Sequence, residues 1–140
     1  MTTTPVAPDD HMDRVHPDSH PGLFKSVEHS LHGVRHILLH ERNARIHLIV
    51  AVLAFLLGVF LEVSPVELAA VFFAVVLVFL AEIFNTAIER TLDLIDVREN
   101  ARIKLIKDMA AGGVLVAATA AVMIGVAIFA PHILELLWPN

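Results

Sequence analysis

Three long apolar segments constrain this chain more than any other feature of its sequence. They cover residues 46–63, 66–95 and 109–130, and a helix of about 20 apolar residues is long enough to cross the hydrocarbon core of a bilayer. The third segment carries a single polar side chain, that of Thr119. With 56% hydrophobic residues in 140, the composition is too apolar for a small water-soluble domain. The sequence therefore predicts an all-α integral membrane protein with three transmembrane helices.

The composition also excludes several classes of function. The chain has no cysteine, which removes disulfides, thiolate zinc sites, iron–sulfur clusters and cysteine nucleophiles. Its formal net charge of -5 repels phosphate, and no basic patch with interleaved aromatic residues is present, so nucleic acid is not an expected partner. Metal sites built from histidine or carboxylate side chains remain open.

The region before the first apolar segment divides into a tail and a helix. Residues 1–21 are rich in proline, aspartate and histidine and poor in apolar side chains, which predicts a disordered cytosolic tail. From residue 23 the pattern becomes helical, with apolar and histidine side chains on opposite faces: Val27, Leu31, Val34 and Leu38 against His29, His32, His36 and His40. This favours an amphipathic helix on the bilayer surface. The four histidines have a spacing that suits a transition metal, although a solvated polar face is the simpler interpretation.

The basic residues predict how the chain crosses the membrane. All ten lysines and arginines lie before residue 46 or between residues 90 and 107. Cytoplasmic loops carry the excess of lysine and arginine. We therefore expect a multi-pass protein of the bacterial cytoplasmic (inner) membrane, with its N-terminus in the cytosol and its C-terminus outside.

A polar stripe interrupts the end of the second apolar segment. On a helical wheel its side chains fall within roughly a 100° arc: Glu82, Asn85, Thr86, Glu89, Asp93 and Asp96. Ionisable groups inside a span cost on the order of 2.5 to 3.5 kcal/mol each, so a functional site is the first hypothesis. Clustered carboxylates attract Mg²⁺, and a nearby lysine at the cytosolic side suits phosphoryl transfer from a nucleotide. A non-catalytic helical membrane protein, whose stripe is a subunit interface or an ion path, remains the alternative.

Three blocks of sequence carry a resemblance to a known family. They are Glu82–Glu89 followed by Asp93, Glu41–His47, and Lys107–Gly112. Together they resemble the bacterial diacylglycerol kinase family, which includes undecaprenol kinases, over about residues 23–130. The resemblance implies a lipid kinase domain over residues 22–140. It also implies phosphorylation of diacylglycerol or undecaprenol with ATP and Mg²⁺, and a homotrimer with shared active sites.

The resemblance also assigns roles to individual residues. Glu82 matches the family's general base, which takes the proton of the lipid hydroxyl, and Asn85 matches a polar residue beside it. Glu41 and Glu89 match the carboxylates that hold Mg²⁺. The residues matched to the nucleotide site are Glu41, Glu89, Asp93, Lys107 and Asp108. Neighbours of the lipid headgroup are expected, besides Glu82, at Arg35, Asn43, Arg45 and His47.

The chain departs from the family pattern near the expected adenine. Many members carry a Tyr-His pair after the second membrane helix, where this chain has Arg98, Glu99 and Asn100. Where members carry a tyrosine on the surface helix, this chain has His29. We place these four residues at the nucleotide site by position, with contacts to the adenine that differ from those of the family.

Overall fold

The computed structural model describes residues 22–95 and 100–138, and all secondary structure in that part of the chain is helical. Its helices are α1 (Leu23–His40), α2 (Arg42–Phe60), α3 (Pro65–Ile95) and α4 (Ala101–Leu137). The expected all-α fold is confirmed. The tail expected over residues 1–21, and the expected nucleotide residues Arg98 and Glu99, lie outside the described residues.

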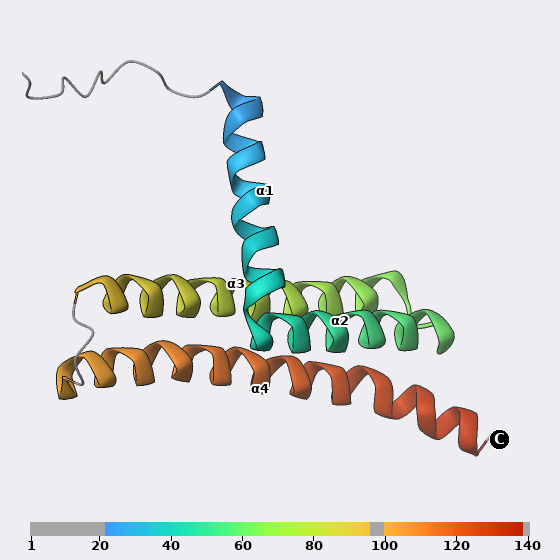
Figure 1. The fold of residues 1–140 in the computed structure, drawn as a ribbon. Helices are drawn as coiled ribbons and strands as arrows, with labels where there is room; N and C mark the ends of the chain where they lie inside the picture. The colour runs from blue at the N-terminus through green and yellow to red at the C-terminus, as the bar shows by residue number, and fades with distance from the viewer. Residues whose placement is uncertain (1–21, 96–99, 139–140) are drawn as a thin grey trace, which may run out of the picture.

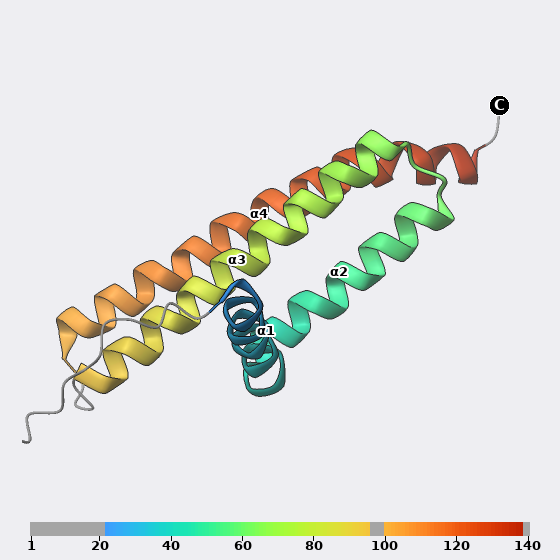
Figure 2. The ribbon, with the colours of Figure 1, turned by 90° about the horizontal axis from the view of Figure 1, so that it is seen from above.

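Three helices lie side by side, and α1 runs across them. The chain reverses direction between α2 and α3 and again between α3 and α4, and α1 stands away from these three helices (Figure 1). Seen from above, α1 is viewed almost end-on, and α3 lies along α4 (Figure 2). By length and composition, α2, α3 and α4 are able to cross a membrane. If they do, α1 lies along the membrane surface, as its amphipathic pattern predicts.

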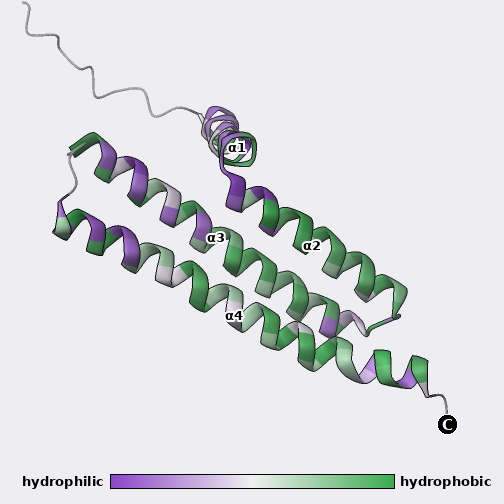
Figure 3. Ribbon diagram, turned by 60° about the horizontal axis from the view of Figure 1, so that its bottom comes forward, coloured by the Kyte–Doolittle hydropathy of each residue, from purple (hydrophilic) through white to green (hydrophobic). Residues whose placement is uncertain are grey.

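The outer surface of the three long helices is apolar. Phe73, Leu115 and Val122 are 70%, 69% and 65% exposed, a pattern that soluble monomers avoid over large areas. Colouring by hydropathy shows apolar helix centres, with polar residues on α1, at the start of α2, toward the end of α3 and at the start of α4 (Figure 3). Helices satisfy their own backbone hydrogen bonds, as hydrocarbon requires. The fold is therefore that of a multi-pass membrane protein.

The turn between α2 and α3 begins earlier than the predicted end of the first span at residue 63. Helix α2 ends at Phe60, and Glu62 adopts a positive φ of 52°. A capping box then starts α3: the Glu67 N–H donates to Ser64 Oγ (3.3 Å) and the Ser64 N–H donates to Glu67 Oε2 (2.8 Å). Pro65 occupies the first helical position, where its missing N–H costs nothing. These local bonds fix the start of α3, whereas the apolar pattern alone continued to Val63.

Helix α4 is longer at both ends than the predicted span of residues 109–130. It starts at Ala101, where the Asn100 side chain accepts a hydrogen bond from the Arg102 N–H (2.9 Å). It continues through Pro131 to Leu137. Proline cannot donate to the carbonyl one turn earlier and bends a helix rather than always ending it, and α4 curves toward its C-terminal end (Figure 1).

Candidate active site

One face of α3 is buried along most of its length, and its chemistry changes partway. Toward the start of the helix this face is apolar, with Val71, Ala74 and Val78. Further along the same face it is polar, with Glu82, Asn85 and Thr86 at 3%, 6% and 8% exposure. These residues follow the three- and four-residue spacing of one helix face. The first part of the stripe therefore points into the protein rather than toward lipid, whereas Asp93 is exposed and Asp96 lies outside the described residues.

An apolar cavity lies against the first part of this face. It has a volume of about 380 Å³, within the range of about 300–1,000 Å³ typical of ligand pockets. Side chains of α2, α3 and α4 all line it, including Val50, Val78 and Ala121. His47 also lines it and interacts with Glu82. The cavity and the polar stripe therefore meet near this histidine.

Glu82 is surrounded by polar groups from two helices and the junction before α2. His47, Glu89, Glu41 and Asn43 lie close enough to Glu82 to influence its charge. The structure thus brings together the expected base, both expected metal ligands and two of the expected headgroup neighbours. The other two expected headgroup neighbours, Arg35 and Arg45, are exposed.

Asn85 makes one hydrogen bond within the stripe and has one buried acceptor atom without a partner in the described part of the chain. Its Nδ2 donates to Glu89 Oε1 (3.3 Å). Its Oδ1 is buried and has no hydrogen-bond partner within the described part of the chain. A buried polar atom without a partner is costly. Asn85 therefore orients Glu89 and presents a free carbonyl oxygen to a hydrogen-bond donor that enters the site.

A second carboxylate–cation contact lies further along α3. Lys107 Nζ of α4 is 2.6 Å from Asp93 Oδ1, so two residues expected at the nucleotide meet across α3 and α4. Asp108, the next residue, is exposed. Asn100 caps α4. His29 is exposed on α1, and the histidines that line the cleft between α1 and α3 are His32 and His36.

The reasoning from sequence missed Arg90. Its Nη2 lies 2.6 Å from Glu41 Oε1, which links α3 to the junction between α1 and α2. On the helical wheel Arg90 falls at about 80° from Glu82, outside the arc of the stripe. The sequence offered one signal, the position of Arg90 beside Glu89 at the polar end of the span, but its partner is 49 positions away in the sequence.

The carboxylates suit a metal ion that arrives with a nucleotide. Within the described residues no group of three or more histidine, aspartate or glutamate side chains is arranged to hold a metal ion. Glu41 contacts Arg90, the residue that follows Glu89 on α3, so both carboxylates lie in the same part of the molecule. Mg²⁺ is usually held by one or two carboxylates together with phosphate oxygens and waters. This donor set fits a nucleotide-bound Mg²⁺.

Fold and site together define a helical integral membrane protein with an acidic site where an apolar cavity meets the polar ends of its helices. Residues 28–129 match the model of the family described as prokaryotic diacylglycerol kinase. The chain is 36% identical over 111 residues to the undecaprenol kinase of Bacillus subtilis, covering 79% of this chain and 90% of that protein. It is 33% identical over 118 residues to the diacylglycerol kinase of Synechocystis sp., covering 84% of this chain and 67% of that protein.

The chain belongs to the prokaryotic diacylglycerol kinase family, which confirms the resemblance seen in the three sequence blocks. It is therefore an enzyme, a membrane lipid kinase of the phosphotransferase class. The non-catalytic interpretation of the polar stripe is not retained.

Proposed function

We propose that this enzyme transfers the γ-phosphoryl group of ATP to the hydroxyl of a membrane lipid alcohol, either undecaprenol or diacylglycerol. The observation that carries the proposal is the position of Glu82. Glu82 is 3% exposed and lies near His47, which lines the apolar cavity. A lipid chain in that cavity would bring its hydroxyl to the one end where a buried carboxylate is close by.

Glu82 is the proposed general base. It takes the proton of the lipid hydroxyl while the lipid oxygen forms a bond to the γ-phosphorus and the bond from that phosphorus to the departing ADP breaks. A positioned base contributes about 10²- to 10⁴-fold to such a step. Asn85 supports the reaction by holding Glu89 and by offering its unpaired Oδ1 to a donor in the site.

The remaining acidic and basic residues form the proposed nucleotide side. Glu41 and Glu89 would hold Mg²⁺, whose positive charge offsets the negative charge of the transferring phosphoryl group. Lys107, oriented by Asp93, supplies positive charge to the phosphates. Asp108 stays a predicted nucleotide neighbour on the adjacent position of α4.

A homotrimer with active sites shared between subunits is part of the proposal. What supports it is the exposure of the first half of α1, which stands clear of α2, α3 and α4 (Figure 1). His29, expected at the nucleotide, and Arg35, expected at the lipid headgroup, are both exposed on α1. In a trimer, these side chains would be able to complete the active site of a neighbouring subunit.

Of the two lipid alcohols, we place undecaprenol first. The match to the Bacillus subtilis undecaprenol kinase spans 90% of that protein, against 67% of the Synechocystis diacylglycerol kinase. The cavity itself accepts either, because apolar walls bind acyl and polyprenyl chains by the same burial. The proposed location is the bacterial cytoplasmic membrane, with the N-terminus in the cytosol and the C-terminus outside, supported by the distribution of lysine and arginine.

Phosphate transfer from labelled ATP in proteoliposomes that contain Mg²⁺ tests the proposal. Undecaprenol and diacylglycerol are offered in parallel, with Glu82→Gln as the blank. Label in one lipid that disappears in the blank would support the proposal and name the substrate. Folded wild-type protein that labels neither lipid would contradict it.

A further inference from the structure

Glu41 occupies a junction that does not fix the direction of its own side chain. It is the single residue between α1 and α2, with extended backbone angles (φ -95°, ψ 121°). Its N–H donates to the Ile37 carbonyl (2.8 Å), but its carboxylate makes no capping hydrogen bond to α2. The backbone therefore places Glu41 at the site while leaving its side chain free to turn.

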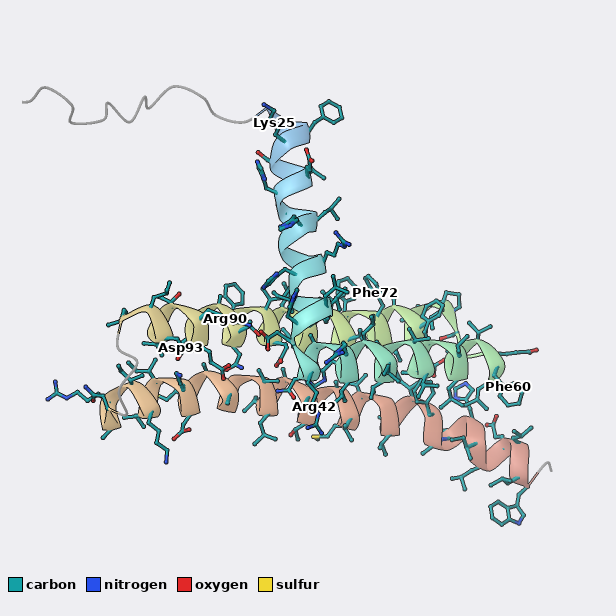
Figure 4. The ribbon with its side chains drawn as sticks, in the orientation of Figure 1. Lys25, Arg42, Phe60, Phe72, Arg90 and Asp93 are labelled. Atoms are coloured by element: carbon teal, nitrogen blue, oxygen red, sulfur yellow. The ribbon has the colours of Figure 1, made fainter. Side chains whose placement is uncertain are left out.

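Arg90 supplies the contact that the junction lacks. Its Nη2 lies 2.6 Å from Glu41 Oε1, a distance typical of a strong charge-assisted hydrogen bond. Arg90 lies on α3 near the end of α1 that joins α2 (Figure 4). Only Oε1 is engaged, and Oε2 makes no hydrogen bond within the described part of the chain. The contact thus orients the carboxylate and leaves one oxygen for another ligand.

The same guanidinium offsets the negative charge of the site. Arg90 interacts electrostatically with Asp93 and Glu89 as well as with Glu41. Without this cation, Glu41 would face the like charge of Glu82, which lies close enough to interact with it electrostatically. A carboxylate at a free junction would then turn toward water, because nothing else in the described chain holds it.

We propose that Arg90 is a positioning residue that holds Glu41 with one oxygen presented to the divalent cation. The inference rests on the proposed function, in which Glu41 and Glu89 hold Mg²⁺. Partners that hydrogen-bond to metal-binding carboxylates typically contribute about 10- to 100-fold in metal affinity or activity. Arg90 acts through Glu41 and does not itself contact the reacting atoms.

The first test is the Mg²⁺ dependence of phosphate transfer in Arg90→Ala, Arg90→Lys and a control, Lys104→Ala. Lys104 is exposed on α4 and near the same end of the helices. We expect Arg90→Ala to raise the half-maximal Mg²⁺ concentration by about 10- to 100-fold, with a smaller change in the rate at saturating Mg²⁺. Arg90→Lys should recover part of the loss because it keeps the charge, and Lys104→Ala should match the wild type.

A binding measurement separates positioning from a merely structural role. Mn²⁺ is titrated into each purified protein with a non-hydrolysable ATP analogue, and the EPR signal of free Mn²⁺ reports binding. We expect weaker binding in Arg90→Ala than in the wild type, by the same factor as in the Mg²⁺ titration. Unchanged binding would overturn the proposal, and so would tighter binding, which would mean that Arg90 competes with the cation for Glu41.

Two further readouts keep the outcomes distinct. Size-exclusion chromatography and thermal unfolding show whether each variant is folded. If Arg90→Ala does not fold, Arg90→Lys is used for the test, and it should bind Mn²⁺ more weakly than the wild type. Wild-type protein that labels neither lipid would count against the proposed function. Active wild-type protein with an unchanged Mg²⁺ dependence in both Arg90 variants would count against this inference alone.

Discussion

Replacing Glu82 by glutamine should move activity and stability in opposite directions. Glutamine keeps nearly the same shape and a group able to hydrogen-bond with Asn43, but it is a poor proton acceptor and carries no charge. Glu82 is 3% exposed and interacts with Glu41 and Glu89, two like charges. The substitution therefore removes the base and, at the same time, removes a buried charge that the fold has to accommodate.

The two effects have different sizes. Loss of a general base costs about 10²- to 10⁴-fold in rate, or about 2.7–5.4 kcal/mol at about 1.36 kcal/mol per factor of ten. An ionised side chain at the centre of a membrane span costs on the order of 2.5–3.5 kcal/mol, which is an upper bound for Glu82 near the edge of the hydrocarbon core. A neutral glutamine avoids the part of this cost that comes from charge, so the variant should unfold at the same temperature as the wild type or higher.

Labelled phosphate transfer in proteoliposomes and thermal unfolding in detergent measure the two quantities on the same preparations. Glu135→Gln is the matched control, because Glu135 is exposed near the end of α4 and should leave both quantities unchanged. A rate within about tenfold of the wild type would refute Glu82 as the base, since it lies below the contribution expected of one. Loss of activity together with a clear drop in unfolding temperature would instead make Glu82 a structural residue.

Four other substitutions test different parts of the structure. Lys107→Gln removes the charge paired with Asp93 and should raise the KM for ATP by more than it lowers kcat, as measured by steady-state kinetics. Ser64→Ala loses the capping hydrogen bond at the start of α3 and should lower the stability by about 1 kcal/mol in a denaturation assay. Gly58→Leu should destabilise by about 1–3 kcal/mol, because a Cβ there already lies 3.1 Å from a neighbouring side chain, whereas Gly125→Ala, with 3.9 Å of clearance, should be tolerated.

The parts of the fold that follow from periodicity were predictable from the sequence. The helix at Leu23–His40 and the shared face of the polar stripe follow from the helical period, whereas the three spans follow from their apolar length, and a membrane allows few alternatives to helices. The ends of the helices were less predictable. Helix α2 stops at Phe60 although the apolar run continues, and α4 passes through Pro131. Turn geometry and the tolerance of a helix for proline depend on packing, and the hydrophobic pattern of the sequence does not reveal this packing.

The pairing of site residues was predictable only within one helix. Asn85 and Glu89 are four residues apart, so their hydrogen bond follows from helix geometry. The contact of Arg90 with Glu41 spans α3 and the junction before α2, and it depends on how the two helices cross. The helical wheel of α3 places Arg90 outside the stripe, and a wheel of one helix does not show contacts with residues elsewhere in the chain.

The length of α3 supports the proposed meeting point of the two substrates. Its 31 residues span about 46 Å at about 1.5 Å per residue, which exceeds the bilayer core of about 30 Å by about 16 Å. Residues 65–81, before the stripe, span about 26 Å, while residues 82–93 span about 18 Å. The apolar part therefore nearly fills the hydrocarbon core, and the stripe is about as long as the overhang. In the proposed function, this arrangement would put Glu82 near the depth of a lipid hydroxyl and Asp93 in reach of a water-soluble nucleotide.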